Sequence, residues 1–158
     1  MFPVSLLHWL AKTSLGVFMR DSTYGFALVE IGHLLALAVF GGAILMVDLR
    51  FLGLGFKSQP IYRVAQELLP LTVGGVIAMS VSGVLLFMGG PVRYYHNPAF
   101  KLKMILFFIA LIFHFALQFG VAKRKAAGRE SLWLKLGAVV SIVLWFAIGL
   151  AGRAIGYV

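Results

Sequence analysis

Two histidines lie inside long apolar stretches, where an ionisable side chain is costly and normally faces a partner. His33 follows Glu30 by three residues, and in a helix the face that they share also holds Leu37 and Phe40. An imidazole there is a candidate haem or metal ligand, or one half of a proton-relay pair with Glu30. The alternative is a histidine that bonds to a neighbouring helix for structural reasons alone.

The second histidine, His114, lies on a polar stripe. At helical spacing it falls on nearly the same face as Lys103, Phe107, Ala110 and Gln118. A stripe of this kind is expected to point into a helix bundle, away from lipid. His114 is therefore a second candidate ligand of a haem iron.

Whether the two histidines bind the same iron depends on their depth. Counting from the start of each apolar stretch places His33 ~9 Å deep and His114 ~15–20 Å deep. The mismatch disfavours a simple bis-histidine pair. Pairing of His33 with His8 or His96 is the other combination. Met79 reaches a similar depth, although core packing is the ordinary role of such a methionine.

A haem also needs basic groups for its propionates. Lys103, Arg93 and Arg153 are expected on one side of the membrane and are candidates for that contact, as is the neighbouring His96. The plainer interpretations are that Lys103 extends to the headgroups, as lysines at helix ends do, and that the tyrosine-rich edges anchor the protein at the interface.

These residues need helices that hold them in a membrane. The chain has 158 residues, of which 61% are hydrophobic and 12% charged. Its mean hydropathy is +0.99, too apolar for a soluble domain. Four stretches are long enough to span a bilayer, namely 27–47, 68–88, 104–122 and 132–152. Short connections predict an antiparallel bundle in one domain, 1–158.

The N-terminal segment has a different pattern. Its apolar residues recur at helical spacing, and Lys12 falls on the opposite side. We therefore predict an amphipathic helix in the interface over residues 3–20. The predicted fold class is an all-α membrane protein, a four-transmembrane-helix bundle with this N-terminal interfacial helix.

The charge is strongly basic, with 14 Lys and Arg against 5 Asp and Glu. Because the basic residues lie mainly between apolar stretches, they indicate anionic lipid headgroups rather than nucleic acid. The side that holds the first and third connections carries eight basic residues and the other side six. We therefore expect the basic run at 123–125 in the cytoplasm and both termini outside.

Several kinds of chemistry are excluded. The chain contains no cysteine, which removes disulfides, iron–sulfur clusters and c-type haem attachment. No phosphate-binding loop, metalloprotease helix or nucleophile elbow is present. Small residues spaced four apart predict close helix packing, within the chain or between copies of it.

Five segments of the chain resemble a family of uncharacterised bacterial inner-membrane proteins, a domain of unknown function. They are VEIGHL at 29–34, the glycine pair at 41–42, VDLRFLGLG at 47–55, NPAFKLK at 97–103 and the ending 141–157 with GRAIGY. The resemblance covers nearly the whole chain. It implies a location in the inner membrane and assigns no activity.

A looser similarity concerns the placement of His33, Arg50, Lys103 and His114. It is similar to that in copper-resistance-D-like and protoporphyrinogen-oxidase-like membrane proteins, some of which bind haem b. The resemblance implies haem b as a cofactor here.

These patterns lead to one functional hypothesis and two alternatives. The first is a haem-b-binding membrane protein that transfers electrons or docks to a membrane or periplasmic redox partner. The second is a non-catalytic membrane subunit or assembly factor. The third is a transporter of a small solute, metal or proton that uses Glu30, His33, His114 and Gln118 as a polar path. The sequence assigns no catalytic residue.

Overall fold

The computed structural model describes residues 4–55, 57–123 and 131–157, and these form helices with no strand. In chain order they are α1 (Val4–Lys12), α2 (Ser14–Asp21), α3 (Thr23–Leu52), α4 (Ile61–Met88), α5 (Pro91–His96), α6 (Pro98–Lys123) and α7 (Leu132–Ala154). Within the described ranges, α3, α4, α6 and α7 are long and apolar enough to cross a membrane. The predicted all-α membrane fold is confirmed.

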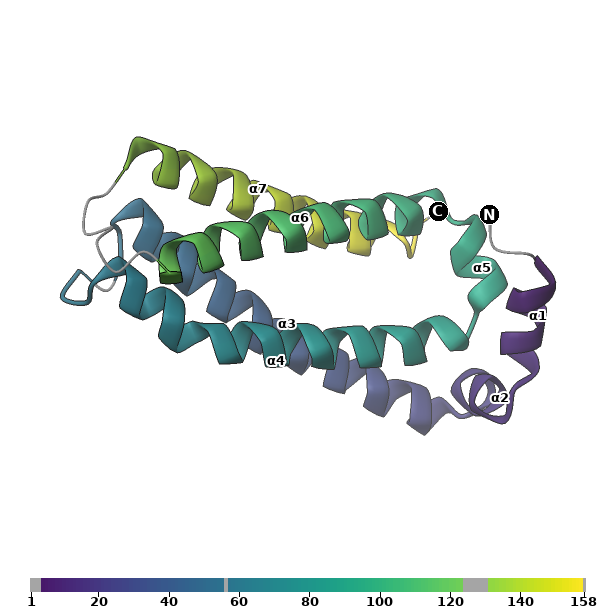
Figure 1. The fold of residues 1–158 in the computed structure, drawn as a ribbon. Coiled ribbons are helices and arrows are strands. Elements are labelled where there is room, and N and C mark those ends of the chain that lie inside the picture. The colour runs from purple at the N-terminus through teal and green to yellow at the C-terminus, as the bar shows by residue number, and fades with distance from the viewer. Residues whose placement is uncertain (1–3, 56, 124–130, 158) are drawn as a thin grey trace.

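The four long helices run alternately up and down (Figure 1). Helix α3 packs chiefly on α4 and α7, and α6 packs on α4 and α7, so that α3 and α6 lie on a diagonal. Both chain ends lie at one end of the bundle, which α1, α2 and α5 cover (Figure 1). We call this the terminal end. The opposite end, where α3 connects to α4, is the loop end.

Helix α3 is longer than the apolar stretch that predicts it, because its ends are set by capping groups. At its start the Ser22 hydroxyl accepts a hydrogen bond from the Gly25 backbone N–H at 3.0 Å. At its end Gly53 adopts a left-handed conformation with φ 80°, which glycine accommodates without strain. The helix therefore continues past Val47 and carries Asp48 and Arg50 within it.

The N-terminal segment contains two helices where the apolar spacing predicts one. Thr13 is extended, with φ −62° and ψ 151°, and its hydroxyl accepts a hydrogen bond from the Gly16 backbone N–H. The same hydroxyl donates to the Leu10 carbonyl at 2.7 Å. Thr13 thus ends α1 and caps α2. The predicted start at residue 3 lies outside the described residues.

Burial is concentrated towards the loop end. One apolar cluster lies there and consists of Val47, Phe51, Ile61, Ala65, Val121, Ala122 and Ala138. A second, which we call the central cluster, is built on Phe40, Ile44 and Met79, with Trp145 packed against it. Met79 therefore has the packing role expected of it. Large apolar side chains elsewhere are exposed, for example Phe146 at 72%, as lipid-facing residues are.

Helices α3 and α4 approach closely at Gly75, where an added Cβ would lie 2.8 Å from the Phe40 Cβ. We expect Gly75→Ala to force the two helices apart and to lower the free energy of unfolding by about 1–3 kcal/mol. Gly74→Ala is the matched control, because a Cβ there meets nothing within 4 Å. Equal stability of the two variants in detergent unfolding would contradict this packing.

Candidate functional site

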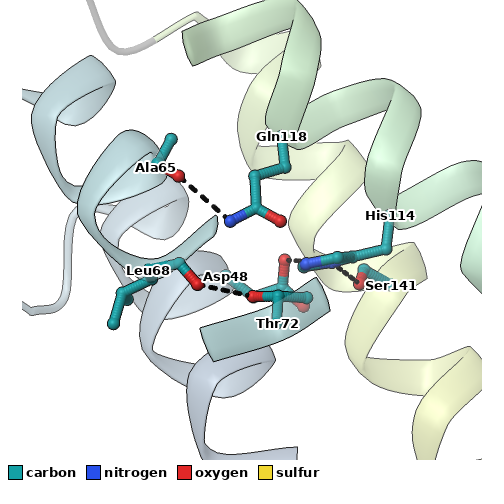
Figure 2. A network of polar contacts seen from close by, with 7 residues as sticks. All are labelled: Asp48, Ala65, Leu68, Thr72, His114, Gln118 and Ser141. Carbon is teal, nitrogen blue, oxygen red and sulfur yellow. Dashed lines mark hydrogen bonds and ion pairs between the residues drawn. The ribbon is translucent and has the colours of Figure 1, made fainter. Parts of the chain in front are cut away.

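Five polar side chains meet in the bundle interior between all four long helices (Figure 2). We call them the buried polar cluster: Asp48 on α3, Thr72 on α4, His114 and Gln118 on α6, and Ser141 on α7. None is more than 1% exposed. The prediction that the α6 stripe faces inward is confirmed for Ala110, His114 and Gln118, whereas Lys103 and Phe107 are half-buried.

His114 lies at the centre of this cluster. Its Nδ1 atom is 3.7 Å from Asp48 Oδ1 and 3.3 Å from Ser141 Oγ. Gln118 donates from Nε2 to the Ala65 carbonyl at 3.1 Å, which ties α6 to α4 (Figure 2). The Thr72 hydroxyl donates to the Leu68 carbonyl at 2.9 Å.

The cluster leaves several buried atoms without a hydrogen-bond partner among the described residues. They are both carboxyl oxygens of Asp48, Nε2 of His114 and Oε1 of Gln118. Most buried polar atoms in proteins are paired, and each exception calls for a physical reason. These four atoms therefore mark the cluster as a candidate functional site.

A second polar site lies nearer the terminal end, around His33. Its Nδ1 atom is 2.8 Å from the Ser82 hydroxyl on α4. That hydroxyl has a single proton, which it donates to the Ala78 carbonyl at 2.6 Å. Ser82 must then accept from His33, so Nδ1 carries a proton and the lone pair of neutral His33 is on Nε2.

Lys103 is the cation associated with this second site. It is half-buried, its charge acts on the His33 imidazole, and its side chain lies against α7. The Lys103 Nζ atom is 3.6 Å from the position that a Cβ on Gly152 would take. Glu30 is exposed and makes no hydrogen bond or ion pair with any described residue. The charge of Glu30 also acts on the His33 imidazole, but the described hydrogen bond of His33 is to Ser82.

The two histidines belong to different halves of the bundle. Asp48 follows His33 by 15 residues on α3, which is about 22 Å of helix, and His114 is beside Asp48. Two axial ligands of one iron must lie within about 4 Å of each other, since metal–nitrogen bonds are about 2 Å long. Both histidines cannot bind one haem in this arrangement.

The remaining candidate residues lie at the terminal end. Arg93 and His96 are exposed on α5, and His96 Nδ1 lies 2.8 Å from the Val92 carbonyl. Arg153 is exposed at the end of α7, where it stacks over the Tyr157 ring at 5.1 Å. No described contact joins any of them to His33.

A hollow of about 330 Å³ opens beside Arg93, between α2, the start of α3 and α5. Arg20 lines it as well and bonds to Asp21 at 2.9 Å. This hydrogen bond lowers the pKa of the Asp21 carboxyl, so the pair stays ionised near neutral pH. The hollow is thus lined by two arginines, one of them already paired.

The sequence patterns predict that His114 and Gln118 face inward. They do not predict that Asp48, Thr72 and Ser141 lie next to them. Asp48 falls one residue beyond the apolar stretch 27–47, and Thr72 and Ser141 are ordinary residues in helices. One signal is present for Asp48: the apolar residues Ile44 and Phe51 lie four residues before and three residues after it, on the same helical face. Within the described ranges no three His, Asp or Glu side chains gather as a metal site.

Comparison with known proteins agrees with the first resemblance. A family model described as "Family of unknown function (DUF6644)" matches residues 2–158. Comparison with curated proteins gives no match, and neither does comparison with solved structures.

Proposed function

We propose that this protein, which belongs to that family of unknown function, binds haem b through His33. The observation that carries the proposal is the bonding of His33 Nδ1 to Ser82, whose proton is already given to Ala78. Nε2 then offers its lone pair in a fixed direction. Such a hydrogen bond behind the ligating ring is typical of iron and other metal sites.

The surroundings of His33 support a bulky apolar cofactor. Apart from Gly25, the buried residues of α3 begin only at Phe40, and those of α6 begin at Ala110. On α7, Ile148 and Ala151 are buried towards the terminal end. Near His33, α3 and α6 therefore bury few side chains of their own. Lys103 and, at the membrane edge, Arg153 supply positive charge for propionates. His114 is not used as a ligand in this proposal.

A haem b supplies one-electron redox chemistry when it is bound. The protein's share is to orient the His33 ring and to exclude water with the apolar side chains of the central cluster. We propose that it exchanges electrons with a membrane or periplasmic redox partner that docks at the terminal end. A bacterial inner-membrane location with periplasmic termini fits the excess of basic residues on the loop side.

The proposed function has a direct test. The protein is purified from haem-replete cells, and its reduced-minus-oxidised spectrum and its iron content are measured. We expect a b-type spectrum with one iron per chain. A featureless Soret region without iron would overturn the proposal, and a stoichiometric partner purified with such a cofactor-free protein would favour a non-catalytic subunit.

The role of Ser82 can be tested separately. Ser82→Ala removes the acceptor that orients His33 and is expected to weaken haem binding by about 10–100-fold. Ser80→Ala is the control, because Ser80 is exposed on the same helix. Haem titration of the purified apoproteins measures both. Unchanged affinity in Ser82→Ala would mean that this hydrogen bond does not prepare a ligand.

The orientation can be tested because the chain has no cysteine. Single replacements Ser58→Cys near the loop end and Tyr157→Cys near the terminal end add one thiol each, and both positions are exposed. In intact spheroplasts a membrane-impermeant maleimide is expected to label only Tyr157→Cys. Labelling of Ser58→Cys alone would reverse the proposed orientation.

A further inference from the structure

The buried polar cluster is not used by the proposed haem site, and its chemistry differs. We propose that Asp48 and His114 form a proton-binding site, in which one transferable proton is shared between the carboxyl group and the imidazole. Ser141, Gln118 and Thr72 form its polar lining. The inference does not depend on whether haem binds at His33.

The first argument is burial. Asp48 is 0% exposed and His114 is 1% exposed. Neither carboxyl oxygen makes a short, well-aligned hydrogen bond, and the donor that acts on the carboxyl is the uncharged Ser141 hydroxyl. An ionised carboxylate in such surroundings costs several kcal/mol unless a positive charge neutralises it. One proton on the pair removes that cost, whichever of the two groups carries it.

The second argument is the pairing of the two groups. His114 is the ion-pair partner of Asp48 in the described structure, at 3.7 Å. On the loop halves of the helices, Arg63, Glu67 and Lys123 are exposed and form no described ion pair with the cluster. Arg50 donates from Nε to the Gln59 carbonyl at 3.0 Å.

The third argument is the bonding of the lining. The Thr72 hydroxyl and one amide N–H of Gln118 already donate to backbone carbonyls. They leave oxygen lone pairs facing the cluster, and the uncharged Gln118 amide acts on His114 as a hydrogen-bond acceptor. Such a lining accepts a proton donor and supplies little positive charge. It therefore suits a site that holds a proton.

The transfer within the site is balanced. The O–H bond of Asp48 breaks as its proton bonds to Ser141 Oγ. The O–H bond of Ser141 breaks as that proton bonds to His114 Nδ1, 3.3 Å away, and the reverse steps restore the first state. The two states are protonated Asp48 with neutral His114, and ionised Asp48 with protonated His114. Both have zero net charge, so neither leaves an unneutralised charge in the membrane. Asp48 lies four residues before the last residue of α3, about 6 Å from the loop end.

The central cluster separates this site from His33. Phe40 and Trp145 meet edge to face there, with ring centroids 5.0 Å apart, and Ile44 and Met79 pack beside them. The proton site thus lies on the loop side of the central cluster, next to the apolar cluster of the loop end.

The test uses the small number of aspartates, since Asp21 and Asp48 are the only two in the chain. Asp21→Asn protein is prepared with ¹³C-labelled aspartate and ¹⁵N-labelled histidine and reconstituted in phosphatidylethanolamine and phosphatidylglycerol vesicles. Infrared spectroscopy then reports the protonation of Asp48. Nitrogen NMR reports that of His114, assigned by comparison with His114→Gln.

At neutral pH we expect the Asp48–His114 pair to hold one extra proton, compared with an ionised Asp48 carboxylate beside a neutral His114 imidazole. It appears as a labelled carboxylic C=O band, as an imidazolium signal, or as a mixture that sums to one. His114→Gln is expected to place the proton wholly on Asp48. An ionised Asp48 beside a neutral His114 would overturn the proposal, and so would spectra that change when choline replaces sodium, since the occupant would then be a metal cation.

Discussion

Membranes that contain the His33→Ala protein are expected to lack the b-type haem signal that the unchanged protein gives. The physical reason is that His33 Nε2 is the only ligand in the proposal, and alanine leaves the iron without an axial bond from the protein. The loss should be complete at equal protein abundance. Reduced-minus-oxidised spectra of purified protein, normalised to protein concentration, measure it.

His96→Ala is the matched control, because His96 is exposed on α5 and bonds only to its own helix. It should keep the full signal. His114→Ala should keep most of it, since His114 lies beside Asp48, which is about 22 Å along α3 from His33. A haem signal that persists in His33→Ala and disappears in either of the other variants would move the cofactor to another site.

The second large effect concerns the stability of the Asp48–His114 pair. His114→Leu leaves Asp48 buried without its partner, and we expect it to lower the free energy of unfolding by about 3–5 kcal/mol. Asp48→Val leaves an imidazole with fewer partners and should cost about 1–3 kcal/mol. The double variant Asp48→Val/His114→Leu should unfold within about 1 kcal/mol of the original protein, because an apolar pair fits an apolar interior.

Reversible unfolding of the four proteins in mixed micelles gives the coupling energy directly. The expected pattern is strongly non-additive, with the double variant more stable than His114→Leu. If instead the losses of the single variants add, the two side chains do not interact. A stable double variant would indicate that the pair is kept for proton binding rather than for stability.

The long helices can be predicted from the sequence, because an apolar stretch of about 20 residues in lipid has to pair its own backbone N–H and C=O groups and therefore forms a helix. Their ends cannot, because hydropathy does not report capping. The Ser22 hydroxyl and the left-handed Gly53 extend α3 beyond the stretch 27–47 at both ends. In the N-terminal segment the apolar spacing continues across Thr13, and only its two hydroxyl hydrogen bonds reveal the break.

The candidate sites were predictable in part for the same reason. Helical periodicity places His114 and Gln118 on an inward face without any tertiary information. Which side chains meet them depends on the register of α3 against α6 and α7, and no periodicity within one helix contains that register. Asp48 therefore falls just outside the apolar stretch 27–47, although it lies beside His114. Counting residues along each helix predicts that His114 is deeper than His33, but the size of the difference depends on that same register.

The distribution of the buried polar cluster over both helix pairs has a consequence for biosynthesis. Asp48 is made with α3, whereas its partners His114 and Ser141 arrive only with α6 and α7. A nascent chain that has inserted α3 and α4 alone therefore presents an unpartnered carboxyl group. Its place about 6 Å from the end of α3 lets that group stay near the headgroups until the second pair docks. Release of the finished protein from the insertion machinery would then depend on its last two helices.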